Sequence, residues 1–331
     1  MRAIIVGLIS FLILSGCKSE KGDAKNMLKN EFMAVRCVGR HVISLPKNFK
    51  ESSLAIGIFR PAGLRAQEPA FEVIIRAGRY TQQQFAAEVQ KRRIEMRRGG
   101  GDRVNVLRLD KEFADGSILL RLQEIEGAHV SEINFLREGI MVTVRLDSYE
   151  DQYLQAEEGL IKFADGVKAS QGGRSSGFCL GAVNIVGNFE AERGSFWFRD
   201  GQGSDFEVDV DTYVADEKVP LLERMRRPDS LLAVFDVTHK VLRARERAVA
   251  GMQAQEWLGW AKISDHSDEK TLKFALETMR SKPSRVSPSI SLTFNTAKSL
   301  EDGTPTKTLV SDDEAMQLWD AVVESIRPAG A

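Results

Sequence analysis

The chain has 331 residues and a formal net charge of −1, with 28% charged and 43% hydrophobic residues. This ordinary globular balance excludes a disordered or collagen-like chain, and the missing basic excess argues against a nucleic-acid-binding protein. At roughly 150 residues per domain, the length predicts two domains. The chain has three cysteines, an odd number that calls for a separate explanation of one of them.

The amino terminus is typical of an exported protein. The uncharged run 3–14 follows Arg2, and at about 1.5 Å per residue it spans only about 18 Å, too short for the roughly 30 Å core of a bilayer. Residues 1–16 are therefore predicted to be a signal peptide. Leu14-Ser15-Gly16-Cys17 comes directly after this run and resembles the bacterial lipobox.

The lipobox resemblance implies cleavage before Cys17 and lipid attachment at its sulfur and at the new amino terminus. Residues 17–30 would then form a lipidated tether. Lys18, in place of the Asp typical of inner-membrane retention, implies the outer membrane, with the body of the protein in the periplasm. The alternative is an ordinary secreted protein with a chance cysteine near its cleavage site.

With Cys17 assigned to lipid, Cys37 and Cys179 form an even pair in an oxidising compartment. A disulfide between them would link the start of one half of the molecule to the start of the other. The alternative is two buried free thiols that pack as small hydrophobic side chains.

The first half of the mature chain reads as strands with two helices. Proline, glycine and serine bound the short apolar strands, and Thr81 is the expected N-cap of a helix over 82–98. A second helix is predicted over 151–167. The predicted strands are 38–45, 54–59, 71–75, 104–109, 118–122 and 140–146. Together they give an N-terminal α+β domain over residues 31–168, and the glycine- and serine-rich stretch 169–177 is the predicted linker.

The second half repeats this plan loosely, as a C-terminal α+β domain over residues 178–331. Cys179-Leu-Gly181 echoes Cys37-Val-Gly39, which allows an ancient duplication. Ser311 and Glu314 form a capping box that opens a final helix. The predicted strands are 178–186, 196–199, 206–214, 231–237, 255–263 and the antiparallel pair 272–279 and 289–295. The expected fold class is α+β, mostly antiparallel, in two domains.

The sequence lacks the usual signatures of catalysis. Ser195 and Ser204 each follow a glycine but lack the rest of a G-x-S-x-G elbow. No two histidines have the spacing that places zinc ligands on one face of a helix or in one loop. The histidines are His41, His129, His239 and His266. We therefore expect no catalytic residue, metal or cofactor, and a binding protein rather than an enzyme.

Two charged runs have both a functional and a structural interpretation. On a strand, Asp205, Glu207, Asp209 and Asp211 share one face. They could bind calcium or a basic partner, but the solvated face of an edge strand is favoured, with Phe206, Val208 and Val210 facing the core. At the end of the helix 82–98, cations are favoured by the helix dipole, and contact with lipid headgroups or an acidic partner is the alternative. These cations are Lys91, Arg92, Arg93, Arg97 and Arg98.

Four segments, taken together in their order, resemble one protein family. They are 37–46, 219–224, 250–258 and 288–294. They are similar to the immunity proteins paired with type VI secretion lipase effectors, the Tle cognate immunity proteins of the fourth group, across roughly residues 35–328. The resemblance implies a non-enzymatic periplasmic protein with two α+β domains that binds a phospholipase toxin and blocks its access to lipid.

We expect a steric mechanism, in which a cleft between the two domains clamps the toxin. The sequence does not identify partner-binding residues, since Trp197, Trp257 and Trp260 are as consistent with a structural role. Two other functions stay open at this point, a structural or assembly lipoprotein of the bacterial envelope and a periplasmic lipid-handling enzyme.

Overall fold

The computed structural model describes the mature body of the chain but not its amino terminus. The described residues are 32–52, 54–62, 69–98, 106–170, 177–213, 219–227, 239–262, 269–279, 282–299 and 303–330. The predicted signal peptide, the predicted tether with Cys17, the predicted strand 231–237 and most of the predicted linker lie outside them. Within these ranges, no helix has the length and apolar character needed to cross a membrane.

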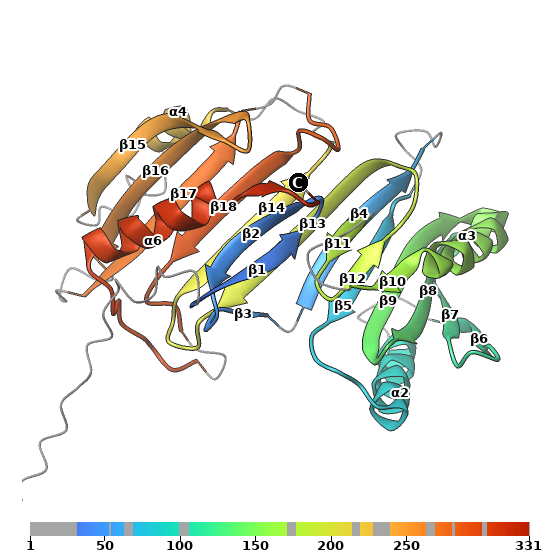
Figure 1. Cartoon of the computed structure of the whole chain (residues 1–331). Coiled ribbons are helices and arrows are strands. Elements are labelled where there is room, and N and C mark those ends of the chain that lie inside the picture. The colour runs from blue at the N-terminus through green and yellow to red at the C-terminus, as the bar shows by residue number, and fades with distance from the viewer. Residues whose placement is uncertain are drawn as a thin grey trace, which may run out of the picture.

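One large antiparallel sheet runs through the whole molecule (Figure 1). Its strands, in spatial order, are β15 (His239–Val249), β16 (Met252–Lys262), β17 (Lys270–Thr278), β18 (Ser289–Asn295), β14 (Asp205–Asp211), β13 (Phe189–Arg199), β4 (Leu54–Pro61), β5 (Phe71–Arg76), β9 (Ile140–Tyr149), β8 (Ala128–Arg137), β7 (Ile118–Ile125) and β6 (Val106–Glu112). The short β3 (Lys50–Glu51) pairs with β13 at one side. The predicted, mostly antiparallel β-structure is confirmed.

The two halves meet inside this sheet, because β4 from the first half pairs with β13 from the second. Gly57 lies opposite Gly194 at the centre of the pairing. A Cβ on Gly57 would lie 2.7 Å from the ring of Phe59 and 2.8 Å from Leu180, so the backbone here passes too close to the next layer for a side chain. The sequence predicted a separate sheet for each half; the structure joins both into one.

Two small sheets form a second layer over the middle of the large one. The first contains β1 (Met33–Val38), β2 (His41–Pro46) and β19 (Arg327–Pro328), and the second contains β10 (Val167–Ala169), β12 (Val183–Ile185) and β11 (Phe178–Leu180). Each predicted strand at the start of a half, 38–45 and 178–186, is in fact part of a hairpin. Gly39 and Gly181 have φ angles of 63° and 57°, a left-handed conformation that lets the chain reverse there.

The helices divide between the two faces of the large sheet. On the face with the small sheets lie α3 (Tyr153–Asp165), which follows the 3-10 turn η2 (Glu150–Gln152), and α6 (Asp312–Glu324). On the opposite face, α2 (Gln82–Arg98) buries Phe85 and Val89 against β7 to β9. The short α4 (Leu221–Arg226) lies at the other end, where the Leu222 amide donates to Gln255 on β16.

Both predicted helix starts have the expected caps. Ser311 and Glu314 form the capping box at α6. At α2, the Gln84 amide donates to the Thr81 hydroxyl, and the Thr81 amide donates to the Gln84 side chain. These reciprocal bonds satisfy amide groups that the first turn of a helix leaves unpaired.

The order of elements is the same in both halves. Apart from the short β3 and the turn η2 of the first half, each half has a hairpin, two strands of the large sheet, a helix, a meander of four strands, a second helix and a short strand. This last strand joins the small sheet that contains the hairpin of the other half. The strand order of the large sheet is therefore symmetric about the β4–β13 pair. The predicted boundary at 169–177 falls between β10 and β11, where the first copy of this order ends and the second begins.

Candidate interaction surface

The predicted cysteine pair lies where the two small sheets meet. The structure joins Cys37 of β1 and Cys179 of β11 in a disulfide, with 5.9 Å between their Cα atoms. Gly39 and Cys179 also exchange two backbone hydrogen bonds, of 3.0 and 2.9 Å. This junction fastens the start of the first half to the start of the second. The oxidation state in the cell stays a prediction, as does lipid attachment at Cys17, which lies outside the described residues.

The described histidines do not form a catalytic or metal centre. His41 is buried on β2, His129 lies with its ring centroid 5.1 Å from that of Tyr153, and His239 is exposed on β15. Ser195 donates to Asp209 rather than to a histidine. No three His, Cys, Asp or Glu side chains gather as metal ligands in the ranges that the structure covers, and His266 lies outside them.

Acidification is expected to destabilise the protein through His41. Both ring nitrogens are buried without a hydrogen-bond partner in the described structure, and burial lowers the pKa of this imidazole from its usual 6.5. Above pH 6.5, folded and unfolded chains are both neutral at this position. As the pH falls below 6.5, the unfolded chain takes up a proton that the folded chain refuses, so the free energy of unfolding decreases.

Denaturant titrations at about pH 7.5 and pH 5 would measure this effect in the wild type and in His41→Leu. The variant should lose less stability between the two pH values. His129, whose pKa is also lowered, by burial and by Arg121 and Arg108, is present in both proteins and cancels in the comparison. Equal losses in both proteins would contradict the assignment to His41.

The acidic run 205–211 forms β14, which lies inside the sheet between β13 and β18. The prediction of an edge strand is therefore wrong, because β18 arrives from more than 70 positions later in the chain to cover the edge. Phe206, Val208 and Val210 are buried toward the small sheets, as the alternation predicted. The acidic side chains point to the opposite face of the sheet.

The four acidic side chains differ in how their charge is balanced. Asp205 is buried, accepts a 2.8 Å bond from Asn295 and lies 3.3 Å from the Lys298 ammonium. Asp209 accepts a hydrogen bond from the Ser195 hydroxyl, and Asp211 accepts one of 2.7 Å from the Tyr213 amide. Burial, and then the charge of Asp209, raises the pKa of Glu207. Negative charge therefore accumulates along the middle of β14.

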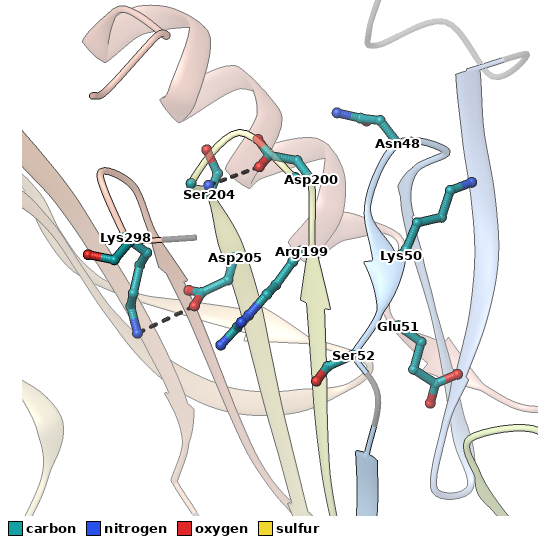
Figure 2. A pocket seen from close by; sticks show the side chains of 12 residues that line it. Asn48, Lys50, Glu51, Ser52, Arg199, Asp200, Ser204, Asp205 and Lys298 are labelled. Carbon is teal, nitrogen blue, oxygen red and sulfur yellow. Dashed lines mark hydrogen bonds and ion pairs between the residues drawn. The ribbon is translucent and has the colours of Figure 1, made fainter. Parts of the chain in front are cut away.

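A polar cavity of about 250 Å³ lies at the Asp205 end of this run (Figure 2). Its walls come from the segment around β3, from the β13–β14 turn and from Lys298, and its charged side chains are Lys50, Glu51, Arg199, Asp200, Asp205 and Lys298. Asp200 accepts bonds from the amides of Gln202 and Ser204 and so shapes the turn. Cations and anions are present in equal number, so the cavity offers no clear preference for a charged ligand.

Next to the acidic run, the same face carries aliphatic side chains. Ile56 on β4 lies opposite Ser195 of β13 on one side and Ile74 of β5 on the other, and Ile58 lies opposite Arg193 and Glu72. Ile58 is 40% exposed, and Ile56 and Ile74 are partly exposed. Among the tryptophans, Trp257 is buried, whereas Trp197 and Trp260 are only partly buried.

Beyond the aliphatic side chains, the face becomes rich in arginine, and several of these arginines have a partner nearby. Arg145 lies 3.9 Å from Glu72, and the Arg60 guanidinium lies 5.4 Å from the Tyr213 ring centroid. The end of α2 contributes two further ion pairs, since Arg92 binds the buried Glu132 at 3.0 Å and Arg93 binds Asp110 at 2.7 Å. The helix dipole is thus not the sole partner of these cations.

A family model matches the second half of the chain. Residues 174–329 match the model of the Tle cognate immunity protein 4 C-terminal domain, the family that the sequence resembles, and the resemblance is confirmed over these residues. A search of curated proteins found no match.

Solved structures resemble nearly the whole chain. The apo immunity protein TplEi of the T6SS from Pseudomonas aeruginosa has 21% identity and a TM-score of 0.64, covering 91% of this chain and 99% of that one. A Tle4–Tli4 complex has the same identity and TM-score, covering 90% and 98%. TplEi complexed with "L" peptide has 20% identity and a TM-score of 0.62, covering 91% and 99%. At these identities, the likeness shows a shared fold.

Proposed function

We propose that this chain, whose residues 174–329 belong to the Tle cognate immunity protein 4 C-terminal domain family, is a periplasmic immunity lipoprotein that binds a type VI secretion phospholipase effector. The family match over residues 174–329 is the observation that carries this proposal. Two further observations support it: this chain shares its fold with TplEi, and it shares its fold with a chain of the solved Tle4–Tli4 complex.

The inhibition is proposed to be steric and to need no chemistry from this chain. The two halves share one sheet, and the Cys37–Cys179 disulfide fastens the layer above it. Such a body would meet the toxin with little rearrangement, which reduces the ordering cost of binding. The expected clamp around the toxin is retained as part of the proposal, with the two halves fixed relative to one another rather than hinged.

Lipid attachment at Cys17 is proposed to hold this inhibitor at the outer membrane. Several acyl chains anchor stably, because each buried methylene contributes about 0.8 kcal/mol. A toxin that attacks phospholipid from the periplasm would then meet its inhibitor at a high effective concentration. The polar tether 17–30 would keep the folded body clear of the lipid headgroups.

The repeated order of elements supports a further proposal about origin. The echo of Cys37-Val-Gly39 in Cys179-Leu-Gly181 places a cysteine and a left-handed glycine at the same point of both leading hairpins. We propose that the two halves arose by duplication.

Co-expression in bacteria tests the function directly. The effector encoded beside this chain is directed to the periplasm, alone or together with the full-length protein. We expect cells with the effector alone to lyse or stop growing and cells with both proteins to grow. A version in which a cleavable secretory signal replaces residues 1–17 should bind the effector equally well but protect less, because it is not concentrated at the membrane.

Death of the cells despite full expression of this protein would overturn the immunity proposal. If no effector is encoded beside this chain, and deletion of its gene causes envelope defects, the structural lipoprotein would be favoured. Release of fatty acids by the purified protein alone would favour the lipid-handling enzyme.

A further inference from the structure

Among the residues that the structure describes, nothing forms a second layer along the middle of one broad face of the large sheet. The small sheets, α3 and α6 cover the other face. On the open face, the described α-helices lie only at the two ends, with α4 on β16 and α2 on β7 to β9. From β18 to β9 the open stretch crosses five strand spacings, or about 24 Å at about 4.8 Å each. This width is close to that of a standard protein–protein contact patch of about 800 Å².

Glu207 and Asp209 have no arginine or lysine opposite them on either neighbouring strand, unlike the corresponding acidic residue of the first half. The two halves can be aligned on the strand pairs β13–β14 and β4–β5. Val210 lies opposite Gly194 in the second half, and Val73 lies opposite Gly57 in the first. The residue before each valine therefore corresponds, which matches Asp209 with Glu72. Glu72 has Arg145 opposite it on the next strand, whereas Asp209 has Ser291 there, and Glu207 has Thr293. Within the described structure, no lysine or arginine lies within ion-pair distance of Glu207 or Asp209; Glu207 has a hydrogen bond from the Trp197 side chain and a weaker interaction with the charge of Lys298, and Asp209 accepts a bond from Ser195.

Three exposed or partly exposed isoleucines lie on the same face, on β4 and β5, with β13 between them and these carboxylates. Arg193 of β13 lies between Ile58 and Asp211, so the carboxylates without a cation beside them are Glu207 and Asp209. Ile56 lies directly across from Ser195, the residue that donates to Asp209. Open faces of antiparallel sheets are usually polar, and an exposed apolar group rimmed by polar residues is typical of a surface that a partner covers. The charge restricts which partner can do so.

We propose that the toxin contacts this open face, with lysine or arginine side chains against Glu207 and Asp209 and an apolar side chain over Ile56, Ile58 and Ile74. This inference rests on the proposed function and names the surface through which it acts. Cationic side chains would neutralise the crowded carboxylates and steer the encounter, and the apolar contact would supply the desolvated centre of the interface.

Other ligands fit this face less well. Anionic membrane headgroups and nucleic acid would be repelled by Glu207 and Asp209. Calcium requires oxygens at about 2.3–2.6 Å from one ion, but alternate residues on one strand lie about 6.6 Å apart and point in parallel. A protein with a basic, partly apolar surface is the occupant that the charges and side chains favour.

Binding of the purified cognate effector to the mature protein tests the surface. Glu207→Lys combined with Asp209→Lys reverses the charge, and Ile58→Glu, at an exposed position, tests the apolar part with little risk to folding. Glu158→Lys combined with Asp165→Lys is the matched control, since both residues are exposed on α3 at the other face. Melting temperatures of all variants show whether each is folded.

We expect the wild type to bind, the control to bind within about twofold, and each open-face variant to bind about 100-fold more weakly. The association rate of the wild type should also fall more steeply with salt than that of the charge-reversed variant. Open-face variants that are folded and bind like the control would overturn the proposed surface while leaving the function intact. A wild type that does not bind the effector would overturn the proposed function itself.

Discussion

Glu256→Gln is expected to lower the free energy of unfolding by about 3 kcal/mol, because it removes the shared partner of three arginines. Glu256 on β16 is completely buried and accepts a 3.1 Å bond from the Trp319 indole of α6. Its oxygens lie 2.8, 2.6 and 3.1 Å from nitrogens of Arg243, Arg245 and Arg247 on β15. This carboxylate therefore ties an outer strand, its neighbour and the final helix together.

Denaturant titration of wild type and variant at neutral pH measures the loss. Glu246→Gln is the matched control, since Glu246 is an exposed acidic residue of the same outer strand. We expect the control to change stability by less than about 0.5 kcal/mol. Asp320 also binds Arg243 and Arg247. If both substitutions have equally small effects, Asp320 alone is enough to hold the arginines and the prediction is wrong.

The same network predicts acid sensitivity. Burial alone would raise the pKa of Glu256, but hydrogen bonds from Trp319, Arg245 and Arg247 and the charge of Arg243 outweigh it and lower the pKa below its usual 4.5. Its contribution to stability is thus present above pH 4.5 and is lost as the pH falls through the lowered value. The wild type should lose more stability than Glu256→Gln over this acid range.

Loss of the Cys37–Cys179 disulfide is expected to destabilise the protein by about 5 kcal/mol on the chain-entropy estimate for its sequence separation of 142 residues. The double variant Cys37→Ala, Cys179→Ala should unfold at lower denaturant than the oxidised wild type. Reductant should lower the stability of the wild type to nearly that of the variant. It should leave the stability of the variant unchanged, because the variant has no Cys37–Cys179 disulfide to reduce.

Alkylation and mass measurement give an independent check. Oxidised mature protein from the periplasm should carry no alkylatable thiol at these positions, and reduction should expose two. Two free thiols in the oxidised sample would contradict the disulfide and support buried thiols, the alternative that the sequence left open.

Local patterns in the sequence predict the elements whose signals are local. The helix 82–98 and the final helix have caps at Thr81 and Ser311, and the strands near 54–59 and 71–75 alternate cleanly. Several strands escape this approach, and β8 and β15 are the two longest of them. In β8, Glu132 and Asn134 are buried polar residues that blur the alternation, because Arg92 of α2 pairs with Glu132. In β15, arginines stand where the alternation would require apolar side chains, and they are stabilised there by their bonds to Glu256.

The arrangement of the strands could not be predicted from these patterns, because it depends on pairings between distant segments. Nothing local in 54–61 indicates that it pairs with 189–199, and this pairing turns two expected sheets into one. The acidic side chains of 205–211 were correctly assigned to one face of a strand. That this strand lies inside the sheet could not be predicted, because it depends on the pairing with the distant β18. The isoleucines beside it, at 56, 58 and 74, become a candidate surface only once the register is known.

The two outermost strands of the large sheet affect how copies of the protein behave when they are crowded. Among the described strands, β15 pairs only with β16 and β6 only with β7, so no described strand covers the outer edge of either. Both edges alternate or cluster charged side chains, as in Arg243, Arg245 and Arg247 on one strand and Asp110, Lys111 and Glu112 on the other. Such edges resist strand-by-strand polymerisation, which would keep copies dispersed if the proposed lipid anchor concentrates them on a membrane surface.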